Sequence, residues 1–536
     1  MQVFDYIIVG AGSAGCVLAY RLSEKGYSVC VLEAGPADSN PYIRIPAGFM
    51  KTYNDPALTW SFTHQGTEHT LGRKIPFIQG KVLGGSSAVN GTIYSRGQKA
   101  DYDLWSSMGC DGWDYASVLP YFRRNESFTG GEDAFRGRDG KLRVDTFPRP
   151  DPLCDSFIQA AQENGIRKNP DYNGQVQEGV GYAQATIYKG KRWSAAHSYL
   201  NPIKKRANIS VRTNATVRRV LVENGRATGV EYSIGDNPGV LAVHAKHCTV
   251  ISAGSVNTPK LLQLSGLGPA ELLRDLNIPV ISDIPGIGQN LVDHYAARIV
   301  VRARKGIDTV NGRARGIPLM REVASWAMGR PSILAVSSAA VYAFCKSDPN
   351  AAQNDYLLSF TPASFKEGMT RQLDDVPGFT SGAYRLRPES RGFVRIQSKV
   401  INDAPIINPN YLAAESDRRI LITALKRSRA ILNSPALAYA FERQIFPKEI
   451  LKSDDEWLDF IRQYGLTTYH LVGTCKMGSL SDPMTVVDSR LRVRGIEGLR
   501  VVDASVMPTT PSGNTNAPTM MIAEKAADML IADRVY

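Results

Sequence analysis

Three short segments at the start of the chain have the hydrophobic pattern of a βαβ unit. Residues 4–9 are mostly apolar and predict a buried parallel strand. A helical pattern follows from residue 13 to about residue 25 and stops at Gly26, a residue suited to helix ends. Residues 27–32 predict a second strand, which ends at Glu33. The order strand, helix, strand predicts parallel pairing.

Two distant apolar segments, residues 248–251 and 500–502, also read as central strands of this first sheet. The first domain is therefore expected to be discontinuous in sequence. Residues 302–459 alternate helical and strand-like segments, with a strand over residues 391–396, and contain no glycine-rich motif. A chain of 536 residues exceeds the usual size of one hydrophobic core, so a second domain is expected there to bind substrate.

Composition predicts a globular enzyme of the cytoplasm. Apolar residues make up 43 % and charged residues 21 %, which is ordinary. There is no run of 18 apolar residues and no pattern of a signal peptide. The seven cysteines are scattered, with no Cys-x-x-Cys pair, which favours reduced thiols and gives no indication of a metal site.

The net charge of +12 comes from basic residues spread along the sequence. They lack the interleaved aromatics of a single-strand binder, so no nucleic-acid partner is expected. Residues 301–330 are the exception, with seven basic residues against Asp308 and Glu322. A solvated helix beside a substrate channel is the preferred interpretation. Peripheral contact with an anionic surface such as the inner membrane is the alternative.

The loop after the first predicted strand reads Gly-Ala-Gly-Ser-Ala-Gly. Gly10 suits a tight turn, Gly12 a close approach to a pyrophosphate, and Gly15 close packing of helix on strand. The helix N-terminus offers N–H groups to phosphate, and Glu33 suits hydrogen bonds from an adenosine ribose. The loop predicts a dinucleotide without choosing between NAD and FAD. Because no second fingerprint exists, a flavin reduced by the substrate is favoured.

Two further motifs identify a family. Residues 80–91, Gly-Lys-Val-Leu-Gly-Gly-Ser-Ser-Ala-Val-Asn-Gly, resemble the first signature of the glucose-methanol-choline (GMC) oxidoreductases, and residues 254–268 match the second signature. The resemblance implies an α/β fold with a discontinuous Rossmann-like FAD-binding domain (residues 1–150, 195–301 and 465–536). The substrate-binding domain (residues 151–194 and 302–464) is expected on an antiparallel sheet flanked by helices.

The resemblance also implies the cofactor FAD and the residues that hold it. Gln79 and Gly91-Thr92 depart from the common Arg and Ala-Met of the first signature. Val89 replaces the histidine that attaches FAD covalently in some relatives, so we expect noncovalent FAD. Asp503 resembles a family FAD contact, with a structural acid as the alternative. The expected cofactor-binding residues are Gly10, Gly12, Ser13, Ala14, Gly15, Glu33, Ala34, Val82, Gly85, Ser86, Asn90, Gly91, Thr92, Ile93, Val217, Asp503, Ala504, Asn516, Pro518 and Thr519.

His470 and Asn514 are the expected catalytic pair. His470 lies in Thr-Tyr-His-Leu-Val-Gly-Thr-Cys-Lys-Met-Gly, which resembles the family's catalytic-histidine segment, although Leu471 replaces a common proline. A neutral imidazole suits removal of an alcohol proton. Asn514 would hydrogen-bond the substrate oxygen. His294 lies in another family motif, Asn-Leu-Val-Asp-His, where a structural role is expected.

The resemblance thus predicts oxidation of a primary alcohol to an aldehyde. The proton passes to His470 and hydride to flavin N5, and the electrons pass to oxygen or a quinone-type acceptor. Pro518 fits the first turn of a last helix that runs to about Ala532, whose N-terminus would face the flavin N1–C2=O region. A lyase or a light-driven decarboxylase on the same flavin scaffold is the alternative.

Overall fold

The computed structural model describes residues 2–146, 151–235, 239–366 and 372–533. The expected domain boundary at residue 150 and the two chain ends lie outside this part of the chain. β1 (Val3–Val9), α1 (Ser13–Glu24) and β2 (Val29–Leu32) confirm the predicted βαβ unit. β1 pairs in parallel with β2 on one side and with β15 (Leu241–Ile251) on the other.

The first sheet has the order β12-β2-β1-β15-β14-β13, and β26 (Leu499–Val501) pairs in parallel with β15. Both distant strands that we predicted therefore join this sheet. β12 (Ile209–Arg212) extends the parallel part, whereas β13 (Ala215–Glu223) and β14 (Arg226–Ile234) add an antiparallel edge. α13 (Asn516–Ala532) packs against α1 and α5 (Tyr115–Asn125), and its side chains are mostly buried.

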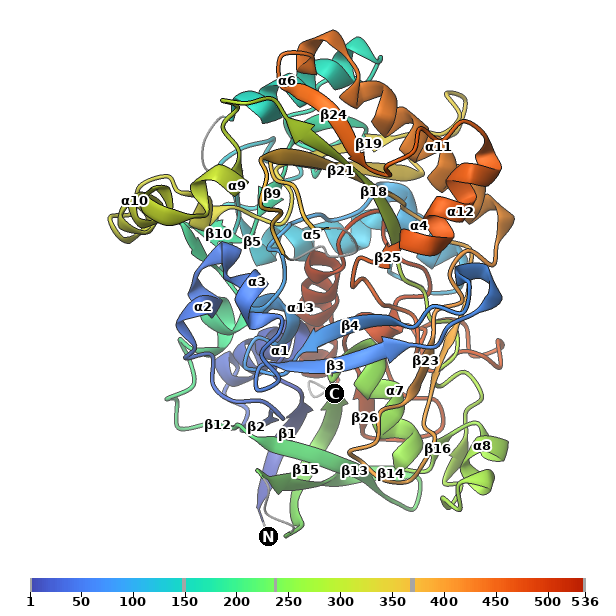
Figure 1. The fold of residues 1–536 in the computed structure, drawn as a ribbon. Helices are drawn as coiled ribbons and strands as arrows, with labels where there is room; N and C mark the ends of the chain where they lie inside the picture. The colour runs from blue at the N-terminus through green and yellow to red at the C-terminus, as the bar shows by residue number, and fades with distance from the viewer. Residues whose placement is uncertain (1, 147–150, 236–238, 367–371, 534–536) are drawn as a thin grey trace.

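The second sheet is antiparallel throughout, with the order β24-β18-β21-β20-β19-β8 and β25 paired to β18. Its strands are β24 (Phe441–Phe446), β18 (Tyr295–Ala303), β21 (Gly378–Arg385), β20 (Tyr356–Thr361), β19 (Val341–Cys345), β8 (Gly179–Tyr182) and β25 (Leu466–Thr467). α6 (Pro152–Glu163), α11 (Glu415–Leu432) and α12 (Asp454–Tyr464) pack against it. Figure 1 shows the two sheets at opposite ends of the molecule, with α13 between them. The α/β fold class that we predicted is confirmed.

The chain enters the second sheet at Tyr295, ahead of the domain boundary that we expected at residue 301. β25 also belongs to this sheet, although it lies within the segment 465–536. The physical reason is pairing, because both segments complete the hydrogen-bond ladder of the antiparallel sheet rather than that of the parallel one. The assignment of the remaining segments to two domains stays a prediction.

Smaller elements complete the fold. The strand expected over residues 391–396 is β22 (Phe393–Arg395), which forms a two-stranded ladder with β23 (Ile406–Asn408) outside both large sheets. The other helices and strands that bear on the site are α2 (Pro41–Arg44), α3 (Phe49–Thr52), β3 (Thr59–His64), β4 (Ile75–Gly80), α4 (Lys99–Ser107), α8 (Ala270–Asp275), α9 (Val310–Arg313) and α10 (Gly316–Ala327).

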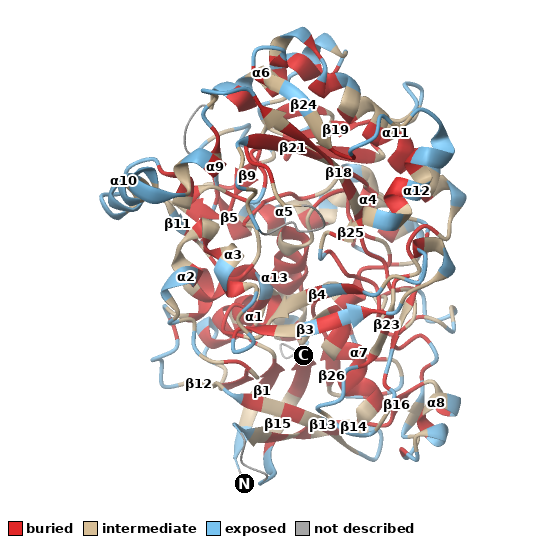
Figure 2. Cartoon of the chain, viewed as in Figure 1, coloured by how far each residue is buried: buried red, intermediate tan, exposed pale blue. Residues whose placement is uncertain are grey.

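α10 projects from the body of the protein and has no buried residue (Figure 2). Its apolar side chains Ile317 and Met320 are strongly exposed, and its Trp326 indole N–H donates to Gly190 O. Peripheral membrane contact of this basic segment stays a prediction. Within the described residues, no helix is both long and apolar enough to cross a membrane.

Candidate active site

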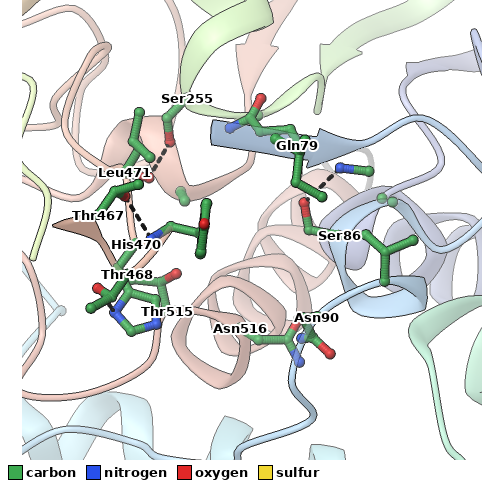
Figure 3. A pocket seen from close by; sticks show the side chains of 18 of the residues that line it. Gln79, Ser86, Asn90, Ser255, Thr467, Thr468, His470, Leu471, Thr515 and Asn516 are labelled. Atoms are coloured by element: carbon green, nitrogen blue, oxygen red, sulfur yellow. Dashed lines mark hydrogen bonds between the residues drawn. The ribbon is translucent and has the colours of Figure 1, made fainter. Parts of the chain in front are cut away.

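A cavity of about 520 Å³ lies between the two sheets and collects residues from both. His470, Asn514 and most of the expected cofactor residues line it, namely Gly10, Gly12, Ser13, Ala14, Glu33, Ala34, Gly85, Ser86, Asn90, Gly91, Thr92, Ile93, Val217, Asp503, Ala504, Asn516 and Thr519. Figure 3 shows His470 with Thr467 of β25 and Thr468 from the segment after it, and Asn516 from the start of α13.

Gly15, Val82 and Pro518 do not line the cavity. A Cβ on Gly15 would lie 2.0 Å from Gly10 O, so this glycine serves the packing of α1 against the loop. Val82 is buried in a small apolar cluster beside the loop. Pro518 lies in the first turn of α13, as predicted, and its ring is buried. These three residues support the walls of the cavity.

The glycine loop is held by close backbone contacts. Gly10 has a φ of +97°, and a Cβ on it would lie 2.5 Å from Ser252 O. Gly85 comes from the segment after β4, and a Cβ there would lie 2.7 Å from the Gly12 Cα. The two glycine-rich segments thus touch backbone to backbone, which leaves the space above them open to a ligand.

Two helix N-termini open into this cavity without a side-chain cap. They are those of α1, with Gly12 as N-cap, and of α13, with Thr515 as N-cap. Ser13 Oγ donates to Asn516 Oδ1 over 2.7 Å and so joins the two ends. Uncapped N–H groups and the positive end of a helix dipole attract anions. The residues present therefore fit the diphosphate and the flavin carbonyl of FAD.

Two buried acids border the cavity. Glu33 accepts hydrogen bonds from the backbone N–H groups of Ala11 and Gly35, at 2.8 and 2.9 Å, and burial raises its pKa to about 7. Each carboxylate oxygen has a further lone pair, so Glu33 remains able to accept a ribose hydroxyl.

Asp503 has no such spare capacity. Its Oδ1 accepts from Ser505 N and Oγ, and its Oδ2 accepts from Gly254 N and Thr258 Oγ1. These four bonds tie the end of β26 to the start of α7 (Gly254–Leu264). The geometry favours the structural role that we gave as the alternative for Asp503.

The departures in the first signature have a structural reason. Gly91 lies so close to Ser338 that a Cβ would be 2.1 Å from the Ser338 Oγ, which explains glycine where the family commonly has alanine. Thr92 follows with a φ of +64°, and its N–H donates to Asn90 Oδ1 over 3.0 Å. The same Oδ1 accepts from the buried Arg192 Nη1 over 2.8 Å, so the Asn90 side chain is fixed at the cavity wall.

His470 and Asn514 meet in the cavity. Asn514 Nδ2 lies 2.9 Å from His470 Nε2, and Asn514 Oδ1 accepts from the Tyr342 hydroxyl over 3.3 Å. Asp293 accepts the His470 backbone N–H over 2.8 Å, which positions the loop. Leu471 is buried among apolar side chains, and its carbonyl accepts from Ser255 Oγ over 2.6 Å. Apolar packing and this hydrogen bond thus hold the chain at Leu471, where the family commonly has a proline.

The hydrogen bonds on the other side of His470 determine its tautomer. His294 Nε2 lies 2.7 Å from Leu386 O, and because a carbonyl only accepts, this nitrogen carries the proton. His294 Nδ1 is then a lone pair, 2.9 Å from His470 Nδ1. Thr468 Oγ1 donates to His294 O and lies 2.9 Å from the same His470 nitrogen. Both neighbours accept, so His470 Nδ1 carries the proton and Nε2 presents a lone pair to the cavity.

Both imidazoles are neutral near pH 7. Burial, followed by the nearby His294, lowers the pKa of His470 well below its usual value. Burial lowers the pKa of His294 to about 4. A neutral imidazole with its lone pair beside an amide N–H is the arrangement that proton abstraction from an alcohol requires.

Several residues of the cavity were not anticipated from the sequence. We had expected a structural role for His294, whereas its side chain contacts the predicted base directly. The family motif around Asp293 and His294 was the available signal. Tyr342 and Tyr384 line the cavity from the second sheet, as does Arg298. No motif marks these three positions.

Two profiles of the GMC oxidoreductase family match the chain, one over residues 4–296 and one over residues 388–523. An oxygen-dependent choline dehydrogenase of Brucella anthropi is 38% identical over 529 residues, covering 98% of this chain and 95% of the relative. The corresponding Sinorhizobium fredii protein is 39% identical over 532 residues, with coverages of 98% and 95%.

Solved structures of other flavoenzymes resemble this protein over nearly its whole length. The pyridoxine 4-oxidase from Mesorbium loti matches with a TM-score of 0.88 and 30% identity, covering 98% of both chains. A formate oxidase matches with a TM-score of 0.90 and 25% identity, covering 100% of this chain and 99% of the other. An FAD-dependent oxidoreductase from Chaetomium thermophilum also matches with a TM-score of 0.90 and 25% identity, covering 99% of this chain and 100% of the other. These likenesses span both sheets and the cavity between them. The chain therefore belongs to the GMC oxidoreductase family and is an FAD-dependent oxidoreductase.

Proposed function

We propose that the protein oxidises a primary alcohol to an aldehyde, with His470 as the base. FAD, held noncovalently, supplies the hydride acceptor, its N5. Among the described residues that line the cavity, His470 is the sole histidine and there is no cysteine. Together with Val89 at the position where some relatives attach FAD through a histidine, this supports noncovalent binding of FAD.

The observation that supports this function most directly is the tautomer of His470. Its Nε2 lone pair faces the cavity and takes the hydroxyl proton of the bound alcohol. Asn514 Nδ2, 2.9 Å from that nitrogen, donates to the alcohol oxygen and fixes the carbinol carbon. Tyr342 holds the amide in this orientation through Asn514 Oδ1. His294 and Thr468 keep the other imidazole nitrogen protonated.

The test is anaerobic mixing of the holoenzyme with aliphatic, aryl and polyol alcohols, followed at the flavin absorbance. We expect bleaching with at least one class, and His470→Ala to slow it by at least ~10²-fold. Ile450→Ala, at an exposed position outside the cavity lining, is the control. An unchanged rate in the histidine variant would remove His470 from the mechanism. Cyanide release, or activity only under illumination, without flavin bleaching would contradict alcohol oxidation.

The electrons leave the reduced enzyme for oxygen or for a quinone-type acceptor. The relatives' names include both an oxidase and an oxygen-dependent dehydrogenase. Peroxide formed in step with aldehyde during aerobic turnover would identify oxygen, whereas turnover that needs an added quinone and forms no peroxide would identify the second acceptor.

A further inference from the structure

Arg298 places a positive charge on the cavity face of the second sheet. It lies in β18, and it lines the cavity together with Ala296 and part of Ala297. Its strand neighbours Ala297 and Ile299 belong to the core cluster beneath α11, as the alternation of a strand requires. In the ladder, Arg298 pairs with Gly382 of β21, which has no side chain to occupy the space beside it.

The guanidinium of Arg298 has no ion pair and no hydrogen bond within the part of the chain that the structure describes. The Phe365 ring lies 5.9 Å from its central carbon and covers one face. Burial lowers the pKa of Arg298 to about 10, so it stays charged at neutral pH. Arg298 lines the cavity, and its five N–H donors have no acceptor among the described residues.

Several largely buried arginines of this protein pair with acids, and the fully buried Arg192 instead donates to carbonyl and amide oxygens. Arg136 Nε lies 2.8 Å from Glu126 Oε1, and Arg96 contacts the same carboxylate. Arg385 pairs with Asp417 over 2.5 Å. A charge removed from water is costly unless it is paired, and these three follow that rule. Arg298 lines the cavity and has no such partner among the described residues.

No carboxylate in the described lining of the cavity forms an ion pair with the Arg298 guanidinium. Glu33 and Asp503 are the acids that line the cavity, and both are bonded to donors around the glycine loop and α7. Lys260 also lines it, but its Nζ donates to Ile401 O over 2.6 Å. The end of the cavity formed by the second sheet is therefore electropositive.

Arg298 also lies near the catalytic segment. Tyr469, the residue before His470, lines the same cavity as Arg298. Ala296, on the same strand face as Arg298, pairs with Leu466 of β25, which leads into that segment. The guanidinium, His470 and Asn514 thus border one cavity, which an alcohol with a second polar group enters.

We propose that the preferred substrate is an alcohol that carries a carboxylate, which pairs with Arg298 while the hydroxyl lies at His470 and Asn514. This inference rests on the proposed function and specifies its substrate class. The planar guanidinium matches a carboxylate with two parallel hydrogen bonds. The same charge opposes an alcohol with a quaternary ammonium group, such as the choline named for the relatives.

The test uses matched alcohols that differ in charge: 4-(hydroxymethyl)benzoate, 4-methylbenzyl alcohol and 4-(hydroxymethyl)phenyl-trimethylammonium, with 4-hydroxybutanoate, 1-butanol and choline as an aliphatic series. The apparent Kd for flavin reduction is measured anaerobically with the holoenzyme. We expect the anionic member of a series to bind at least ~10-fold more tightly than the neutral one, and the cationic member most weakly.

Arg298→Gln should abolish this preference, and Arg298→Lys should retain part of it, because a lysine keeps the charge without the fork. Arg302→Gln is the matched control. Arg302 lies on the same strand, outside the cavity lining, with its Nε 3.5 Å from Glu442. A preference that is absent in the wild type, or that survives in Arg298→Gln, would overturn the inference and leave Arg298 as a support stacked on Phe365.

A second measurement separates this inference from the proposed function. Binding of 4-methylbenzoate, which has no hydroxyl, is followed by the shift it causes in the oxidised flavin spectrum. Binding that Arg298→Gln weakens supports the anion site even if no alcohol bleaches the flavin. Bleaching by alcohols that depends on His470, with no binding of 4-methylbenzoate in the wild type, would support the proposed function and overturn the anion site.

Discussion

The two sheets of this protein contribute to the cavity in different ways. The parallel sheet presents backbone, since glycines at positions 10, 12 and 85 bring loops into contact and two uncapped helices offer N–H groups. The antiparallel sheet presents side chains, with Arg298, Tyr342 and Tyr384 on its inner face. Backbone recognition suits a cofactor that is always the same. Side chains on strand faces vary without disturbing the ladder, which suits a region that selects the substrate.

His470 and Asn514 belong to neither surface alone. Both lie on loops between the sheets, and they take their partners from the second sheet and its flanking segments, as the Tyr342 and His294 contacts show. The catalytic pair therefore depends on how the two halves are joined.

The largest expected effect concerns the backbone contacts that the loops of the parallel sheet make at the cavity. Gly85→Ala should weaken FAD binding about 10- to 100-fold, because the new methyl would lie 2.7 Å from the Gly12 Cα. FAD retained after gel filtration, and the Kd for added FAD, measure this. Gly225→Ala is the control, since Gly225 also has a positive φ, of +75°, but has nothing within 4 Å. Equal losses in the two variants would attribute the effect to backbone strain rather than to the contact of the loops.

The next prediction concerns the contact between His294 and the catalytic His470. His294→Leu removes one of the two acceptors of the His470 Nδ1 proton and should slow flavin reduction by about 10-fold. His294→Asn keeps an oxygen near that position and should lose less. Because His294 is the second cause, after burial, of the lowered His470 pKa, the acid limb of the rate profile should move to higher pH in both variants. A rate loss with no shift of the profile would indicate that His294 is only structural.

The smallest expected effect concerns the close contact between Gly91 and Ser338. Gly91→Ala restores the alanine common in the family but places a methyl 2.1 Å from Ser338 Oγ. We expect a loss of about 1–3 kcal/mol in the free energy of unfolding, measured by urea denaturation of the holoenzyme. Ser338→Gly in the same chain should recover most of it. If the double variant is no more stable than Gly91→Ala, the contact with Ser338 is not the cause.

Much of the parallel half was predictable because its requirements are local. The strand before Gly10, the helix after Gly12 and the acid at Glu33 follow one another at spacings that backbone geometry imposes. The antiparallel half was predictable only as a class of fold. Tyr295 illustrates the limit, because nothing in its neighbourhood shows that β18 leaves the first half and pairs with β21.

The sequence by itself determined the βαβ unit, the glycine loop, the family and the two residues His470 and Asn514. These depend on short motifs whose residues act near one another along the chain. Only the tertiary structure decided that His294 orients the imidazole of His470, that Ser338 requires glycine at Gly91, and that Arg298 has no acid beside it among the described residues. Hydrogen-bond partners and counter-charges come from segments far apart in sequence, so they exist only once the two sheets have packed around the cavity.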